Sequence, residues 1–257
     1  MRARHTVVVA LAPLVLIGTV APTVHADTAV GDTRITSVTV KPATGVGADL
    51  KTGVTVSLTA TDNSGIDRVI GTKLTGPDGL VIPASSTTCK ARSAITVQCR
   101  IFFPLWPKGT DPGNLRNSAA GAWRFTAKAV AVNGDSHRLS PGKLLHVKRH
   151  ATLQSLEATP RPVGKGGKLT LSGRLQRANW DTNSWEGYAG RPVALQFRKS
   201  GTKKFKPVKT VTTDSAGRLH TTVTAKTTGS WRWRFTADTE STGAKSQHQR
   251  VVVRQQS

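Results

Sequence analysis

Three neighbouring residues carry the side-chain types of a hydrolytic triad. Asp135, Ser136 and His137 follow one another directly after Asn133-Gly134. A working triad needs members that converge from separate segments, so that the base can reach the nucleophile and the acid can orient the base. Adjacent positions in an Asn-Gly-Asp turn do not provide this, so the segment predicts a turn. Because the sequence also lacks a nucleophile elbow and a phosphate-binding loop, we predict no catalytic residues and no enzyme activity.

Side chains that could bind a metal ion are scattered along the sequence. Beyond the amino-terminal segment the histidines are His137, His146, His150, His220 and His248. Their positions do not indicate convergent ligands. Asp62, Asp67 and Asp78 could instead gather calcium at one end of a β-sandwich, but their spacing does not match an EF-hand loop. We therefore interpret these acids as solvated turn residues and predict no metal and no cofactor.

One segment has the composition of a sugar-binding platform. Trp180, Trp185 and Tyr188 stand among Asn, Asp and Glu residues between two expected strands. Flat aromatic faces edged by polar groups can hold a sugar ring, yet the same rings can anchor a long loop onto a core because each buries a large apolar area. The anchoring role is the favoured interpretation, and a carbohydrate site at these three residues is the alternative.

The two cysteines, Cys89 and Cys99, lie ten positions apart in the expected exported part of the chain. An even number of cysteines in an oxidising compartment favours a disulfide, and this spacing is not that of a zinc site. We therefore predict one disulfide bond between Cys89 and Cys99.

Apolar and polar residues alternate with a period of two along most of the chain. Residues 34–40 and 54–60 are examples, and both are rich in Thr, Val and Ile, which suit a half-buried strand. Turn residues separate such runs, as in 76–79, which reads Gly-Pro-Asp-Gly. About seven strands and no convincing helix fall in residues 27–150, a pattern typical of an immunoglobulin-like sandwich.

The second half repeats this pattern with different residues. Seven further segments between 152 and 253 read as strands. In one of them Trp231, Trp233 and Phe235 fall on one face while arginines fall on the other, as expected when one face of a sheet is buried. The fold class predicted from the whole pattern is all-β, with two immunoglobulin-like β-sandwich domains after a cleaved signal peptide.

The first 26 residues have the three-part layout of a secretory signal. Arg2 and Arg4 form a basic head, residues 6–21 are mostly apolar and uncharged, and 24–26 (Val-His-Ala) supplies a cleavage site. Cleavage there would start the mature chain at Asp27. We therefore expect a secreted, extracellular protein with no transmembrane segment after signal removal.

The expected organisation has three parts. Residues 1–26 are the signal peptide, residues 27–150 the first sandwich domain and residues 151–257 the second. No Gly/Ser-rich linker separates the two domains near His150, so we expect them to abut with limited freedom.

Several short motifs resemble bacterial immunoglobulin-like domains. In the first half these are 62–69 (DNSGIDRV), 121–125 (GAWRF) and 133–135 (NGD). The second half is similar to an immunoglobulin-like module common in secreted actinobacterial proteins, through residues 163–166, 171–175, 188–193, 213–217 and 229–233. The resemblance covers most of the mature chain. It implies extracellular or surface modules without a conserved active site, and fold alone does not define a function.

The chain is strongly basic, with 37 Lys and Arg residues against 14 acids and a formal net charge of +23. Such a surplus attracts polyanions. The charges are spread along the expected strands, which favours a solvated surface with weak, salt-sensitive binding over a sharp site. The predicted partners are anionic cell-wall polymers or polysaccharide, and we expect no specific binding of nucleic acid.

These observations favour a secreted, non-catalytic binding or structural protein that contacts anionic polymers of the cell envelope electrostatically. A carbohydrate-binding module that uses the loop aromatics is the alternative. An uncharacterised enzyme, or an accessory domain of a secreted enzyme, is the second alternative.

Overall fold

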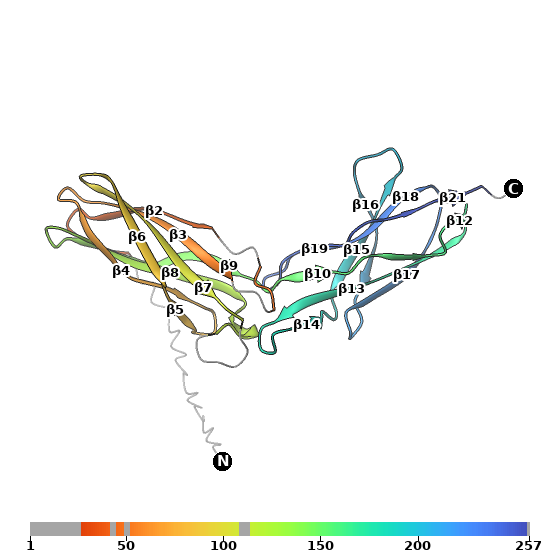
Figure 1. Cartoon of the computed structure of the whole chain (residues 1–257), viewed down its shortest axis with the longest axis horizontal. Helices are drawn as coiled ribbons and strands as arrows, with labels where there is room; N and C mark the ends of the chain where they lie inside the picture. Colours follow the sequence, from red (N-terminus) through yellow and green to blue (C-terminus); the bar gives the residue numbers. More distant parts are fainter. Residues whose placement is uncertain (1–26, 42–44, 49–51, 108–113, 256–257) are drawn as a thin grey trace, which may run out of the picture.

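The computed structural model describes residues 27–41, 45–48, 52–107 and 114–255 (Figure 1). The predicted signal peptide, residues 1–26, lies outside the described residues. Within the described part, strands make up almost all of the regular structure, and the one exception is a short 3-10 helix, η1 (Asn117–Ala119). No helix of this part is long and apolar enough to cross a membrane. The prediction of an all-β chain is therefore confirmed.

The first sandwich consists of two sheets with antiparallel neighbours. Its strands are β1 (Thr28–Val30), β2 (Arg34–Lys41), β3 (Thr52–Thr61), β4 (Ile66–Thr75), β5 (Val81–Pro83), β6 (Ser86–Ser93), β7 (Thr96–Leu105), β8 (Gly121–Ala131) and β9 (Ser136–Val147). One sheet has the order β2-β3-β7-β6, and the other has the order β1-β9-β8-β4-β5. The alternating side chains of β3, β7 and β8 fill the space between the two sheets.

The strand order identifies this sandwich as immunoglobulin-like. That fold places strands A, B, E and D in one sheet and strands C, F and G in the other. With β2 as strand A, the order β2-β3-β7-β6 corresponds to A-B-E-D, and β9-β8-β4 corresponds to G-F-C. The expectation of an immunoglobulin-like fold is met by the connectivity itself.

The second sandwich has the same plan with shorter outer strands. Its strands are β10 (Ala151–Leu153), β11 (Glu157–Thr159), β12 (Val163–Gly164), β13 (Lys168–Asn179), β14 (Ser184–Gly187), β15 (Pro192–Lys199), β16 (Lys206–Thr212), β17 (Arg218–Thr224), β18 (Gly229–Phe235), β19 (Ala244–Lys245), β20 (Gln249–Val251) and β21 (Val253–Arg254). In one sheet β13 pairs with β10, β11, β14 and β17. In the other, β15 lies between β16 and β18, while β19 and β20 both pair with β18.

Each core contains a tryptophan whose ring nitrogen is satisfied by the backbone. Trp123 on β8 donates its indole N–H to the carbonyl of Ala119 at 2.7 Å, and Trp233 on β18 donates to the carbonyl of Ser172 at 2.9 Å. Both side chains are fully buried. A buried indole needs such an acceptor because its N–H has left water. The expectation that Trp231, Trp233 and Phe235 lie on the buried face of their strand is confirmed.

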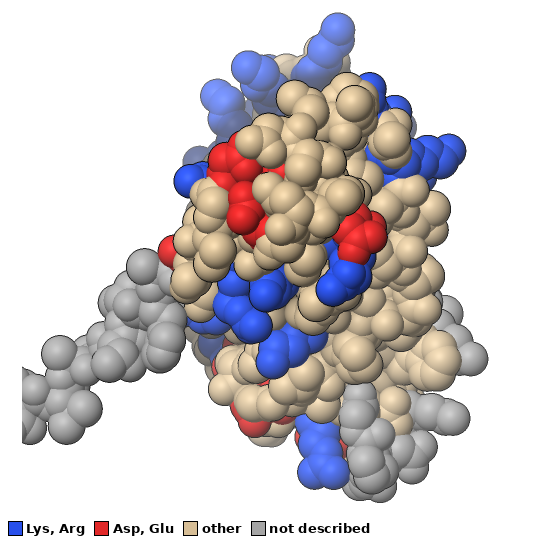
Figure 2. Space-filling view, turned by 90° about the vertical axis from the view of Figure 1, so that its left-hand side faces the viewer, with Lys and Arg blue, Asp and Glu red and all other residues tan. Residues whose placement is uncertain are grey.

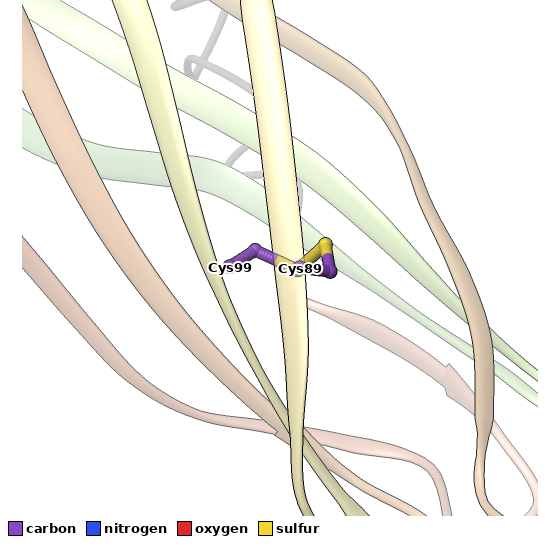
Figure 3. The surroundings of a disulfide bond; sticks show 2 residues. All are labelled: Cys89 and Cys99. Atoms are coloured by element: carbon purple, nitrogen blue, oxygen red, sulfur yellow. A yellow bond between two sulfur atoms is a disulfide. The ribbon is translucent and has the colours of Figure 1, made fainter.

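The disulfide joins an exposed edge strand to the sheet (Figure 3). Every residue of β6 is exposed, so burial of apolar surface contributes little to holding this strand. Cys89 on β6 lies directly opposite the buried Cys99 on β7, and the two are bonded, as the sequence predicts. The bond therefore fixes the register of β6 where side-chain packing does not.

The backbone on either side of Arg149 connects the two sandwiches, which lie end to end (Figure 1). Val46 of the first sandwich donates its N–H to the carbonyl of Lys148 and accepts from the N–H of His150. Between these bonds, Arg149 donates its N–H to the carbonyl of Glu240, and its own carbonyl accepts from the N–H of Thr242. Lys148 and His150 thus pair this segment with the first sandwich, and Arg149 pairs it with the second.

We predict that replacing both cysteines, Cys89→Ala with Cys99→Ala, lowers the free energy of unfolding of the first sandwich by about 3 kcal/mol. The unbridged unfolded chain regains the entropy of a short closed loop, and the chain-entropy model gives roughly that value. Urea denaturation of the two proteins measures the difference. Reductant should destabilise the wild type and leave the double variant unchanged, and equal sensitivity of both would contradict a stabilising bond.

Candidate functional site

One sheet of the second sandwich presents a row of basic side chains to solvent. Along β15 and β18 the residues Val193, Leu195, Trp231 and Trp233 face the core, so the residues between them point outward. We call the outward-facing residues Arg198, Arg232, Arg234, Lys245 and Arg250 the basic face. Five cations on adjoining strands make this sheet surface a candidate site for anions.

Strand pairing sets the positions of these cations. Ser230 on β18 lies opposite Arg198 on one side and opposite Arg250 on the other. Two residues further along β18 comes Arg232, and two further comes Arg234, which lies opposite Lys245. Successive rows on one face of a strand are about 6.8 Å apart. The basic face is therefore a small two-dimensional array, built from residues that are far apart in the sequence.

Among the described residues, no acidic side chain forms an ion pair with the basic face. The ion pairs of the described residues in this sandwich and at the junction involve other arginines, namely Arg149, Arg177 and Arg191. Burial lowers the pKa of the Arg232 guanidinium, and the neighbouring charges of Arg234 and Arg198 lower it further. An arginine perturbed by other arginines lies in a strongly positive local field. It stays charged at neutral pH because the unperturbed pKa of arginine is above about 12.

A turn between β15 and β16 adds an aromatic ring to this surface. Phe205 is half-buried, and its ring lies beneath the guanidinium groups of Arg232, at 3.9 Å, and Arg198, at 4.7 Å. The ring of His248 lies 6.1 Å away in an edge contact. Guanidinium groups stacked on a ring lose rotational freedom. Phe205 therefore restricts the guanidinium groups of Arg198 and Arg232, and the Nε–H of Arg232 also donates to the side-chain oxygen of Gln196 at 2.9 Å.

A cavity of about 240 Å³ lies at one corner of the basic face. Arg198, Lys199, His248 and Arg250 line it together with the backbone and hydroxyls of the β15–β16 turn. Acidic side chains are absent from this lining. At this corner the cations Arg198 and Arg250 line a concave space, whereas the rest of the basic face is a sheet surface.

A larger cavity, of about 640 Å³, lies over the opposite sheet of the same sandwich. Its lining contains Arg174, Arg218 and His220, but also the carboxylates Glu157 and Asp214. Charges of both signs offset one another at short range, so this groove attracts a polyanion less than the basic face does.

Three acids cluster at the end of the first sandwich that lies away from the second. Asp32, Asp62 and Asp135 come from the turns after β1, β3 and β8, with their carboxylate oxygens within 4.8 Å of one another. Figure 2 looks onto this end of the molecule, where acidic side chains gather beside basic ones. Asp62, Asp67 and Asp78, considered above as possible calcium ligands, do not come together. Asp67 pairs with Arg68, and the hydroxyl of Ser118 donates to Asp78.

Protein donors already occupy the buried member of this cluster. Asp62 accepts hydrogen bonds from the hydroxyl of Ser64 at 2.6 Å, from the hydroxyl of Thr33 at 2.6 Å and from the Ser64 N–H at 2.8 Å. These bonds lower the pKa of the Asp62 carboxyl to about 2. The arrangement is typical of a side chain that organises turns, as expected, but Asp62 is 3% exposed, so the expectation that it is solvated is wrong.

The three candidate sugar-binding aromatics do not form one exposed platform. Trp180 is 0% exposed and packs in the core cluster of the first sandwich, where its indole N–H donates to the carbonyl of Val46 at 3.2 Å. Tyr188 is 3% exposed and packs in the core of the second. Trp185 is 38% exposed and contacts the ring of His150 edge-on. Only one of the three rings is therefore open to a ligand.

The polar groups around these rings hold the junction together. Glu186 accepts hydrogen bonds from Arg149 at 2.6 Å and from Arg177 at 2.9 Å. Burial raises the pKa of the Glu186 carboxyl, but these bonds outweigh burial, so the pKa lies below its ordinary value. The guanidinium groups of Arg177 and Arg191 lie 4.1 and 4.4 Å from the centre of the Tyr188 ring, which leaves it no open face for a sugar.

Sequence reasoning missed the basic face because its members are separated by as many as 52 positions, from Arg198 to Arg250. In the sequence the charges look diffuse, and only the pairing of β15, β18, β19 and β20 brings them together. A usable signal was present, since residues 191–213 and 241–257 contain no Asp or Glu. Long stretches without acids in a basic β-protein indicate that one sheet carries charge of a single sign.

Comparison with known proteins finds solved structures of low similarity. Neither a protein family nor a curated protein shows significant sequence similarity to the chain. Solved structures similar to it include the D00-D0 domain of intimin (14% identity, 84% of this chain and 100% of that chain covered, TM-score 0.30) and the D0-D1 domain of intimin (13%, 85% and 98%, 0.28). Another is dimeric latent PorU from Porphyromonas gingivalis (15%, 89% and 20%, 0.27). At such low scores the assignment of fold rests on the strand order of this chain.

We predict that Trp180→Ala lowers the free energy of unfolding by about 3–5 kcal/mol, because the change leaves a cavity in a packed core. Trp185→Ala should cost less than about 1 kcal/mol, because that ring is partly exposed. Urea denaturation compares the two variants. Equal costs would contradict the division of these rings into a core anchor and a surface residue.

The low pKa of Asp62 predicts acid sensitivity of the first sandwich. Because the folded state holds this carboxyl ionised, its contribution to stability is complete above the ordinary pKa of about 3.8 and is lost as pH falls toward 2. Urea midpoints between pH 5 and pH 2 should therefore fall less steeply in Asp62→Asn than in the wild type. Asp214→Asn in the second sandwich controls for the loss of one acid, and identical slopes in all three proteins would contradict the assignment.

Proposed function

We propose that this chain is a secreted, non-catalytic binding protein that attaches to anionic polymers of the cell envelope through the basic face. The observation that carries the proposal is the array of five cations, Arg198, Arg232, Arg234, Lys245 and Arg250, without an acidic partner among the described residues. Each cation that meets an anionic group releases counterions, so binding to a polyanion grows with the number of contacts.

Two further observations support a role outside the cell and without catalysis. The disulfide between Cys89 and Cys99 is typical of an oxidising compartment. The acids with clearly shifted pKa values, Asp62, Glu186 and Asp238, all form hydrogen bonds that hold turns or the junction, and none of them lines either cavity in the second sandwich. Catalytic acids and bases are expected in a cleft, where their shifted pKa values can act on a substrate.

The placement of the aromatics favours this proposal over a carbohydrate module built on them. Trp180 and Tyr188 are buried by protein contacts, whereas Arg234, Lys245 and Arg250 of the basic face are exposed and Arg198 and Arg232 are half-buried. A polymer can therefore reach the cations without any rearrangement of the sandwich.

Sedimentation with purified cell-wall fragments tests the proposal. We expect the wild type to bind at low salt and to be released as the salt concentration rises. In the double variant Arg234→Glu with Arg250→Glu, the slope of log affinity against log salt should fall by about 1.5, because two contacts are lost. The matched control is Lys90→Glu with Lys168→Glu, which makes the same charge change at exposed positions on other sheets.

Two outcomes would contradict the proposal. The first is no binding of the wild type at low salt. The second is an equal loss of affinity in the control variant, which would mean that total charge matters and the basic face does not.

A further inference from the structure

The cavity at the corner of the basic face has the lining of an anion site. It is formed by the end of β15, the turn that follows it, the start of β18 and the region around β20. Arg198 and Arg250 reach it from strands on the two sides of Ser230, so two guanidinium groups flank one hydroxyl in the same row. Guanidinium groups only donate hydrogen bonds, so an acceptor-rich, negatively charged group suits the space between them.

The residues around these arginines strengthen the same preference. Lys199 and His248 also line the cavity, as do Ser200 and Thr202 of the turn, where the Thr202 hydroxyl donates to the carbonyl of Lys199 at 2.8 Å. With no acid in the lining, this cavity differs from the larger groove on the opposite sheet, where Glu157 and Asp214 would repel an anion. The position of Arg198 is also restricted, because its guanidinium lies over the ring of Phe205 at 4.7 Å.

The geometry of the donors distinguishes between kinds of anion. The two oxygens of a carboxylate lie in one plane and are satisfied by a single bidentate arginine. A phosphate directs its oxygens tetrahedrally and can accept from two arginines on opposite sides and from a hydroxyl between them. A volume of about 240 Å³ also exceeds what a lone ion needs, and leaves room for part of the molecule to which the phosphate is attached.

We infer that this cavity is a phosphate site, and that Arg198 and Arg250 are its main ligands for one phosphate of a polyol-phosphate polymer. From there the polymer continues over Arg232 and then over Arg234 and Lys245, in rows about 6.8 Å apart. The inference rests on the proposed function, because it names the chemical group that the basic face selects. The inference goes beyond the proposed function because it assigns one anchoring site that differs from the rest of the basic face.

Titration of the chain from Asp27 onward with glycerol 3-phosphate tests the site directly. Amide chemical shifts of Gly201, Thr202 and Ser230 should change saturably, whereas glycerol and acetate should leave them unchanged. Arg250→Gln should weaken binding about tenfold, because it removes a charge-assisted hydrogen-bond donor. The matched control is Arg234→Gln, which makes the same charge change on the same face outside the cavity and should alter the affinity less than twofold.

A competition experiment with two polymers tests whether the site prefers phosphate over carboxylate. A glycerol-phosphate polymer should displace the chain from wall fragments at lower charge concentration than polygalacturonate, whose charges are carboxylates. Equal displacement by the two polymers would overturn the preference for phosphate.

The remaining outcomes separate this inference from the proposed function. Shift changes spread over all basic surfaces, or equal losses in Arg250→Gln and Arg234→Gln, would overturn the phosphate site even if wall binding persists. Saturable binding of glycerol 3-phosphate in a protein that does not sediment with walls would support the site and remove the proposed function.

Discussion

The alternation of side chains along β18 is the constraint on which both the fold and the candidate site depend. Trp231, Trp233 and Phe235 must face the core, because each ring has a large apolar surface. The pleat of a strand then directs Arg232 and Arg234 to the other face. The aromatic rings thus fix the sheet, and the sheet in turn fixes the cations. A slip of one residue in this strand would bury arginines and expose tryptophans, so its register is strongly specified.

Buried side chains connect the second sandwich, which has the basic face, to the first sandwich. Trp180 extends from the second sandwich into the core of the first, and the buried guanidinium of Arg149 donates to the carbonyl of Ala178 at 2.6 Å and to Glu186. Removing either partner of a buried ion pair leaves an uncompensated charge, so such a pair has one well-defined arrangement. These contacts lie at the junction of the two sandwiches, which are arranged end to end (Figure 1).

The strands that alternate clearly were predictable, and those that do not were missed. The run 54–60 lies within β3, where every second residue from Val54 to Ala60 is apolar and buried. By contrast β6 is exposed throughout, so no periodic signal marks it, and its place depends on pairing with β7. β14 was missed for a similar reason, because buried and exposed residues do not alternate along it. The basic face could not be predicted from any one segment, because it forms only when strands distant in the sequence pair with one another.

The clustering of cations also links ligand binding to stability. Like charges at Arg198, Arg232 and Arg234 repel one another. Burial is the largest cause of the lowered pKa of Arg232, and the charges of Arg234 and Arg198 lower it further. In the unfolded chain these residues are further apart, so their repulsion opposes folding. An anion that binds between them relieves this repulsion only in the folded state, and by linkage it stabilises the sandwich. A surface that needed only solubility could have interspersed acids among these arginines. Under the proposed function, binding of an anionic polymer to the basic face would therefore raise the stability of the second sandwich.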